Sequence, residues 1–199
     1  STLITLFSCL MGIAIGVVVS IVRSTWDKAG ADMRPGFSRG LLRVLNRIAV
    51  IYLTVIRGTP VVIQLMIAYY VIFAFSSNGV LVATLAFGLN SGAYVAEIFR
   101  GGIMSIDKGQ FEAGRSLGFN YVQTMAYIVV PQVIKNVLPA LANEFISLLK
   151  ETSVAGYVTV ADLTYAGNRI RGVTFSPFMP LIAVALIYLV LVMFFPVLI

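Results

Sequence analysis

The sequence predicts an all-α integral membrane protein that crosses the bilayer about five times. Of its 199 residues, 59% are hydrophobic and only 11% are charged, whereas soluble domains carry about 25% charged residues. The charges are also clustered, because residues 1–22, 58–96 and 172–199 contain no Asp, Glu, Lys or Arg. Uncharged apolar stretches of roughly 18 residues or more are what a bilayer about 30 Å thick requires of a spanning helix.

These stretches divide one transmembrane domain, residues 1–199, into its spans. We predict spans at about 1–22, 50–75, 80–102, 127–149 and 178–199. The uncharged stretch 58–96 is long enough for two helices, and Ser76-Ser77-Asn78-Gly79 supplies a turn between them. The fourth span contains prolines and charges, which membrane helices tolerate where neighbouring helices satisfy the backbone.

The first apolar stretch is expected to be a spanning helix. A cleavable signal peptide would need a basic flank before it and a shorter apolar segment. Since the chain starts inside one apolar run and stops inside another, truncation of either terminus stays open.

Composition also excludes several kinds of chemistry. Histidine is absent and Cys9 is the only cysteine, so zinc, haem and iron–sulfur sites lack their usual ligands. The chain has no Gly-rich nucleotide loop ending in Gly-Lys-Ser/Thr. We therefore expect this chain to bind no metal and no cofactor and to catalyse no covalent reaction. The net charge of +6 indicates loops at an anionic cytoplasmic leaflet, with no nucleic-acid partner.

Orientation follows from the basic residues in the short loops. Residues 103–126 contain Lys108 and Arg115, and the turn at 76–79 is uncharged. The segment 23–49, which follows the first span, holds Arg23, Lys28, Arg34, Arg39, Arg43 and Arg47. We therefore predict that loops 23–49 and 103–126 are cytoplasmic, with the N-terminus outside and the C-terminus inside.

The cytoplasmic segment before the fourth span has two helix-start signals. Asp107 with Gln110 three residues later forms a capping-box pattern, and Asn120 with Gln123 repeats it. Gly118 between them is suited to end a helix. These signals predict two short helices that meet at Gly118 in a hairpin over about residues 104–122. An ordinary surface connector is the alternative.

Residues in and after this hairpin resemble the EAA loop of prokaryotic ABC importer permeases. The matching residues are Glu112-Ala113-Gly114, Gly118, Ile128 and Pro131, with the spacing of that motif. Gly114 replaces the third motif residue, alanine, and Val130 replaces the leucine before Pro131. The resemblance implies the fold of an ABC type I importer permease, in which this loop is a coupling helix that docks on the ATPase subunit.

Further segments resemble the polar amino acid branch of that family. They are Arg57-Gly58-Thr59-Pro60 with Gln64, Tyr94 through Gly102, Gly109-Gln110, and Asn143-Glu144-Phe145-Ile146 through Lys150-Glu151-Thr152-Ser153. Two features depart from the pattern, namely the insert Trp26–Arg39 and the absence of a basic tail after the last span.

The resemblance implies partners as well as a fold. It implies a second permease subunit (a homodimer or a pseudo-symmetric heterodimer), two cytoplasmic ATPase subunits that bind ATP and Mg, and an extracytoplasmic substrate-binding protein or fused domain. The residues expected to contact the ATPase are Asp107, Gln110, Glu112, Ala113, Gly114, Arg115 and Gly118.

Polar residues inside predicted spans are costly and indicate function. In the fourth span, Asn136, Asn143, Ser147 and Lys150 share one helical face by their spacing. Polar residues on the second and third spans form similar stripes. The three stripes together suggest a shared water-accessible cavity. The candidate path residues are Asn143, Glu144, Ser147, Lys150, Glu151, Arg57, Gln64, Asn90, Tyr94 and Glu97. The alternative is that Glu97, Arg57 and Lys150 pair inside the bundle and only hold helices together.

The chemistry of the fourth-span cluster suits an amino acid zwitterion. Lys150 can bind the α-carboxylate, while Glu144 can bind the α-ammonium group or a basic side chain. We therefore expect a permease that moves polar or charged amino acids by alternating access. The alternatives are a scaffold subunit without a solute path, a permease for another small polar solute, or an ion-coupled transporter working alone, which would be expected to have more spans.

Overall fold

The computed structural model describes residues 2–30, 36–76, 78–158 and 160–198, so that Arg34 and Ser77 lie outside the described residues. Within them the chain consists of helices and connecting turns. The elements in order are α1 (Thr2–Ala29), α2 (Phe37–Gly58), α3 (Val61–Ile67), the π-helical turn η1 (Ala68–Ile72), α4 (Gly79–Met104), α5 (Lys108–Ser116), α6 (Tyr121–Thr124), the π-helical turn η2 (Met125–Val129), α7 (Val130–Glu151), the 3-10 turn η3 (Thr152–Val158), α8 (Leu163–Thr174) and α9 (Phe178–Leu198). Four helical stretches are long and apolar enough to cross a membrane, or five if α2 and the following short helix form one bent span. This confirms the predicted all-α membrane fold.

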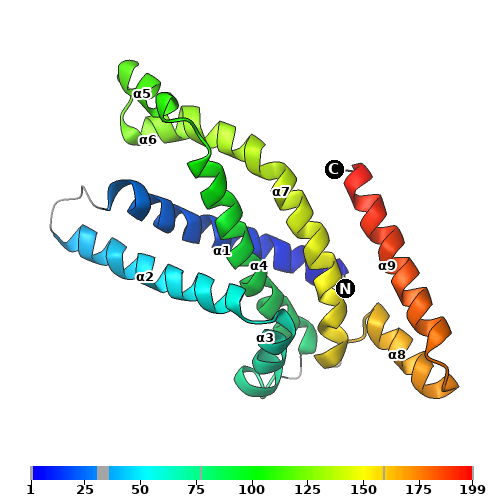
Figure 1. Ribbon diagram of the computed structural model, residues 1–199. Helices are drawn as coiled ribbons and strands as arrows, with labels where there is room; N and C mark the ends of the chain where they lie inside the picture. Colours follow the sequence, from blue (N-terminus) through cyan, green and yellow to red (C-terminus); the bar gives the residue numbers. More distant parts are fainter. Residues whose placement is uncertain (1, 31–35, 77, 159, 199) are drawn as a thin grey trace.

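The helices form an elongated bundle with two distinct ends (Figure 1). The short helices α5 and α6 project at one end, whereas α3, α8 and the turn before α9 lie at the other. Helix α4 is central, because it packs against α1, α2 and α7. The hairpin therefore continues directly from the helix that contacts most of the bundle.

Small residues allow α1 and α4 to pack closely. A Cβ atom added at Gly12 would lie 2.9 Å from the Ser91 hydroxyl oxygen, and one at Gly16 would lie 2.5 Å from Val95. On the facing helix, a Cβ added at Gly92 would lie 3.0 Å from Ile15. Close approach of helix backbones is how membrane helices gain packing energy without a hydrophobic driving force between them.

The second span differs from its predicted bounds of 50–75. Helix α2 begins at Phe37, so the segment 23–49 is not a simple loop but is helical at both of its ends. The chain then turns by 108° between α2 and α3. Pro60 explains the break, because proline lacks an N–H donor and holds the preceding Thr59 in an extended conformation.

The fourth span is longer than the predicted 127–149. Residues Tyr121–Val158 form one continuous helical stretch that contains a π-helical turn before α7. Pro131 lies in the first turn of α7, directly after that widened turn, where its missing N–H donor is tolerated. Pro131 therefore does not end the helix.

Candidate functional site

The hairpin at the α5–α6 end matches its local sequence signals. The Asp107 carboxylate accepts a hydrogen bond from the backbone N–H of Gly109 at the start of α5. Gly118 has a φ of 78°, which is the left-handed conformation that glycine adopts most readily. Asn120 and Gln123 form a complete capping box at the start of α6. The predicted pair of short helices meeting at Gly118 is thus confirmed.

The first capping box is only half formed, and this corrects the prediction for Gln110. Its side-chain oxygen accepts a hydrogen bond from Gln132 on α7 at 3.1 Å, instead of bonding back to Asp107. The Gln132 amide also donates to the backbone oxygen of Ile128. Gln110 therefore connects the hairpin to the start of the fourth span.

Gly114, where the motif has alanine, is explained by the packing of α5 on α6. A Cβ atom at this position would lie 2.5 Å from the hydroxyl oxygen of Thr124. Both residues are buried, whereas Glu112, Ala113 and Arg115 are exposed. The motif therefore divides into a buried glycine that lets the two helices touch and an exposed face that is open to a partner.

Five charged residues form a chain across α1, α2 and α4. Arg57 lies 3.6 Å from Glu97, and Arg100 contacts Glu97 at 3.5 Å. Arg100 also contacts Asp27 at 2.9 Å, and Arg23 lies 4.0 Å from the same carboxylate. The contact between Arg57 and Glu97 is the pairing inside the bundle that the sequence offered as an alternative to a path. Lys150 forms no ion pair among the described residues.

Two other predicted path residues, Gln64 and Asn90, bond to each other at the break in the second span. The Gln64 amide donates to the backbone oxygens of Ile56 and Thr59 at 2.7 and 3.0 Å. Its oxygen accepts a hydrogen bond from Asn90 on α4 at 3.0 Å. Gln64 thus caps the end of α2 and fixes the bend against α4. Nearby on α4, the Tyr94 ring lies 5.9 Å from the Arg57 guanidinium.

The residues of α7 divide into an inward and an outward group. Glu144 is half-buried and accepts a hydrogen bond from Ser91 of α4 at 2.9 Å. Ser147 and Glu151 are also half-buried, whereas Asn143 and Lys150 are exposed. Within a single protomer, the candidate residues of α2, α3 and α4 thus contact each other, whereas part of the polar face of α7 stays exposed. The expected convergence of all three helices on one cavity stays a prediction.

Sequence reasoning missed Ser91 and Asp27. Ser91 lies in a run of small residues on α4, and its role depends on the tertiary contact with Glu144. Asp27 had a usable signal, because it follows Arg23 by four residues on a helix and is one of two acidic residues among the basic ones in the segment 23–49.

The fold and the projecting hairpin define the class of ABC importer permeases. The structure superimposes on the crystal structure of an amino acid ABC transporter with histidines at a TM-score of 0.84 and 36% identity, covering 98% of this chain and 85% of that chain. It also matches the fold of the MetNI methionine ABC transporter in an inward-facing conformation, at a TM-score of 0.76 and 20% identity, covering 97% of this chain and 86% of that chain.

Comparison at the level of sequence gives the family. Residues 35–199 match the binding-protein-dependent transport system inner membrane component family. The arginine transport system permease protein ArtQ of Bacillus subtilis is 36% identical over 193 residues, covering 96% of this chain and 81% of that protein. The glutamine transport system permease protein GlnP of Escherichia coli K12 is 34% identical over 192 residues, covering 94% and 82%. The chain belongs to this family, and is a multi-pass inner-membrane permease component of an ABC transporter.

Proposed function

We propose that this chain imports polar or charged amino acids as the permease subunit of an ATP-driven transporter. It acts with a second permease subunit, two cytoplasmic ATPase subunits that bind ATP and Mg, and an extracytoplasmic binding protein or fused domain. The substrates named for its relatives and for the matching structure are arginine, glutamine and histidine, which supports this substrate class. The N-terminus lies outside and the C-terminus in the cytoplasm.

The observation that carries the proposal is the exposed polar face of α7. Asn136, Asn143 and Lys150 recur every seven residues, and all three are exposed in a helix that is otherwise apolar enough to span a membrane. Exposure of such groups to lipid is unfavourable by several kcal/mol, about 2.5–3.5 for a lysine at mid-bilayer. The face therefore requires a second protein surface or a water-filled path, and two copies of it facing each other provide both.

The charges on this helix suit an amino acid zwitterion. Lys150 supplies a cation for the α-carboxylate, and Asn143 and Ser147 can both donate and accept hydrogen bonds. Glu144 and Glu151 supply anions for the α-ammonium group or a basic side chain. Arg57, Tyr94 and Glu97 act mainly as structural contacts, because they already engage each other.

Coupling to ATP hydrolysis runs through the hairpin. The exposed Glu112, Ala113 and Arg115 form the surface that contacts the ATPase, while Gln110 transmits its displacement to α7 through Gln132. When the ATPase subunits close on nucleotide, the hairpins move together and the path between the two permeases changes its open side. This is alternating access by rigid-body motion.

The proposal is tested by reconstituting the complete transporter in liposomes and measuring ATP-dependent uptake of arginine, glutamine and histidine. Glu112→Lys reverses a charge on the exposed face and should abolish uptake while leaving the protein in the membrane. The matched control is Lys135→Glu, because Lys135 is exposed on α7 outside the hairpin. Normal uptake by Glu112→Lys would exclude this surface as the ATPase contact, and uptake of other polar solutes alone would exclude amino acids.

A further inference from the structure

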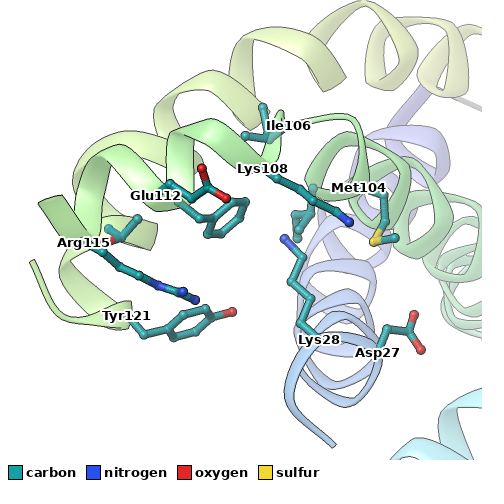
Figure 2. A pocket seen from close by; sticks show the side chains of 11 residues that line it. Asp27, Lys28, Met104, Ile106, Lys108, Glu112, Arg115 and Tyr121 are labelled. Atoms are coloured by element: carbon teal, nitrogen blue, oxygen red, sulfur yellow. The ribbon is translucent and has the colours of Figure 1, made fainter. Parts of the chain in front are cut away.

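A cavity of about 700 Å³ lies between the hairpin and the ends of α1 and α4 (Figure 2). Helices α1, α4, α5 and α6 contribute its walls. The lining consists of Asp27, Lys28, Ile103, Met104, Ile106, Lys108, Phe111, Glu112, Arg115, Tyr121 and Thr124. None of the ten candidate path residues lines it. The cavity is therefore separate from the proposed substrate path.

Three cations extend into this cavity from two helices. Lys28 reaches in from the end of α1, and Lys108 and Arg115 reach in from α5 (Figure 2). The Lys28 ammonium group lies 4.0 Å from the centre of the Phe111 ring, which holds it at the wall of the cavity. Like charges that converge on one space repel each other unless an anion lies between them.

The acidic residues of the cavity lining do not balance these three cations. Asp27 is already engaged, because its carboxylate contacts Arg100 at 2.9 Å outside the cavity. Glu112 is the remaining acidic residue of the lining, and among the described residues it forms no ion pair with Lys28, Lys108 or Arg115. Three cations thus face one carboxylate, and the site favours an added anion.

We propose that this cavity binds the phosphate headgroup of an anionic phospholipid from the cytoplasmic leaflet, which rests on the proposed orientation of the permease. The cavity lies where the apolar spans α1 and α4 end, which is the level of the headgroups. Ile103, Met104 and Phe111 add an apolar wall that suits the glycerol and upper acyl region of a lipid. Free phosphate is also an anion, but it has no apolar part to contact that wall.

The test uses the complete transporter in detergent, titrated with phosphatidylglycerol or phosphatidylcholine and examined by native mass spectrometry. Lys28→Gln combined with Lys108→Gln removes two cations and leaves Arg115 of the proposed ATPase contact intact. Each basic residue near a membrane surface contributes enough that the double variant should bind phosphatidylglycerol about thirtyfold more weakly. Lys135→Gln combined with Arg169→Gln makes the same charge change at exposed positions outside the cavity, and should bind it like the wild type.

Each result decides between occupants. Equal phosphatidylglycerol binding by the cavity variant and the wild type would overturn the proposal, as would full displacement of the lipid by inorganic phosphate. The double variant could instead lose the ATPase subunits while it binds phosphatidylglycerol like the wild type. That result would identify an acidic segment of the ATPase as the occupant of the cavity and would also overturn the proposal. A wild type that binds phosphatidylglycerol through Lys28 and Lys108 but imports no amino acid would support this inference while contradicting the proposed function.

Discussion

Ser91 of α4 donates a hydrogen bond from its hydroxyl group to the Glu144 carboxylate of α7 over 2.9 Å. The contact joins two spans, each of which is otherwise apolar enough to cross the membrane. It uses Oε1 of Glu144, and among the described residues Oε2 has no protein partner. Glu144 thus has one oxygen that fixes its position and a second that can bind a ligand.

The first prediction is that Glu144→Gln discriminates against basic substrates. Glutamine keeps the acceptor for Ser91 and the shape of the side chain but removes the negative charge. Binding of the substrate arginine should weaken by about 1–3 kcal/mol, the range for hydrogen bonds to charged groups. Binding of glutamine as a substrate should change less. The measurement is KM for both substrates in proteoliposomes with the binding protein present. An unchanged ratio of the two KM values would show that Glu144 is structural.

The second prediction is that Lys150→Met weakens the import of every α-amino acid. All of these substrates share the α-carboxylate, which we assign to the Lys150 cation, so the loss should be about 1–3 kcal/mol for each. Lys135→Met is the matched control, because it removes an exposed lysine from the same helix. ATPase activity should persist where uptake fails. If uptake and ATPase activity fall together, the lesion is in coupling and the assignment of Lys150 is wrong.

The third prediction concerns the contact between Gly114 and Thr124. Gly114→Ala adds a methyl group that would lie 2.5 Å from the Thr124 hydroxyl oxygen, and overpacking of this kind costs about 1–3 kcal/mol. Thr124→Ala removes the hydroxyl oxygen and the methyl carbon, which would lie 2.5 and 2.6 Å from the new methyl group, so the double variant should regain most of the loss. Thermal unfolding of the four proteins of this cycle measures the coupling. Additive effects would mean that α5 and α6 do not pack as described.

The fourth prediction tests orientation with single cysteines in a Cys9→Ser background. Lys108→Cys lies in the hairpin and should react only with reagents on the cytoplasmic side. Ser176→Cys lies between α8 and α9, at the opposite end of the bundle (Figure 1), and should react only from outside. Both positions are exposed, so each cysteine should be accessible to a reagent on its own side of the membrane. Labelling of Lys108→Cys from outside would reverse the proposed topology.

The fifth prediction is a pH dependence of stability from Asp162. Burial raises the pKa of this carboxyl above its ordinary value of 3.8, and this outweighs the opposing hydrogen bond from the Tyr165 N–H. The folded protein therefore binds this proton more tightly than the unfolded chain. The resulting stability is present below pH 3.8 and is lost as the pH rises through the folded-state pKa.

Asp162→Asn isolates that effect, because asparagine also caps a helix well. The variant should match the wild type at low pH and become the more stable of the two as the pH rises. Asp162→Ala should be about 1 kcal/mol less stable than Asp162→Asn at all pH values through loss of the cap of α8. Thermal unfolding in detergent across the acid range measures all three proteins. Parallel wild-type and Asp162→Asn curves would mean that the carboxyl does not titrate as described.

The hairpin could be predicted from the sequence because its signals are local. The capping residue Asp107, the glycine at position 118 and the capping box at Asn120 each act within a few residues. The spans could be predicted because uncharged apolar stretches are long enough to cross a bilayer. Pro60 stands in the sequence, but the apolar stretch continues across it, so hydrophobicity alone did not indicate the bend between α2 and α3.

The pairing of polar residues could not be predicted, because it depends on which helices touch. Gln64 stays a predicted path residue, and nothing in the sequence indicated that its amide donates to the end of α2 or that its oxygen accepts from Asn90. Glu97 pairs with Arg57, forty residues earlier, and with Arg100 one turn later. A helical spacing places residues on a common face, but it does not say whether another helix of the chain covers that face.

The chain of ion pairs from Arg57 to Arg23 has a consequence for how the permease moves. It ties α1, α2 and α4 together at one level, while the glycine contacts lock α1 onto α4 along its length. We expect these three helices to keep their positions relative to one another during transport. Relative motion then occurs between α4 and α7. The hydrogen bond from Ser91 to Glu144 that joins these two helices can break and re-form without separating opposite charges. On the proposed coupling route, displacement of the hairpin reaches α7 through Gln132, and α7 is also the helix that carries the exposed Lys150.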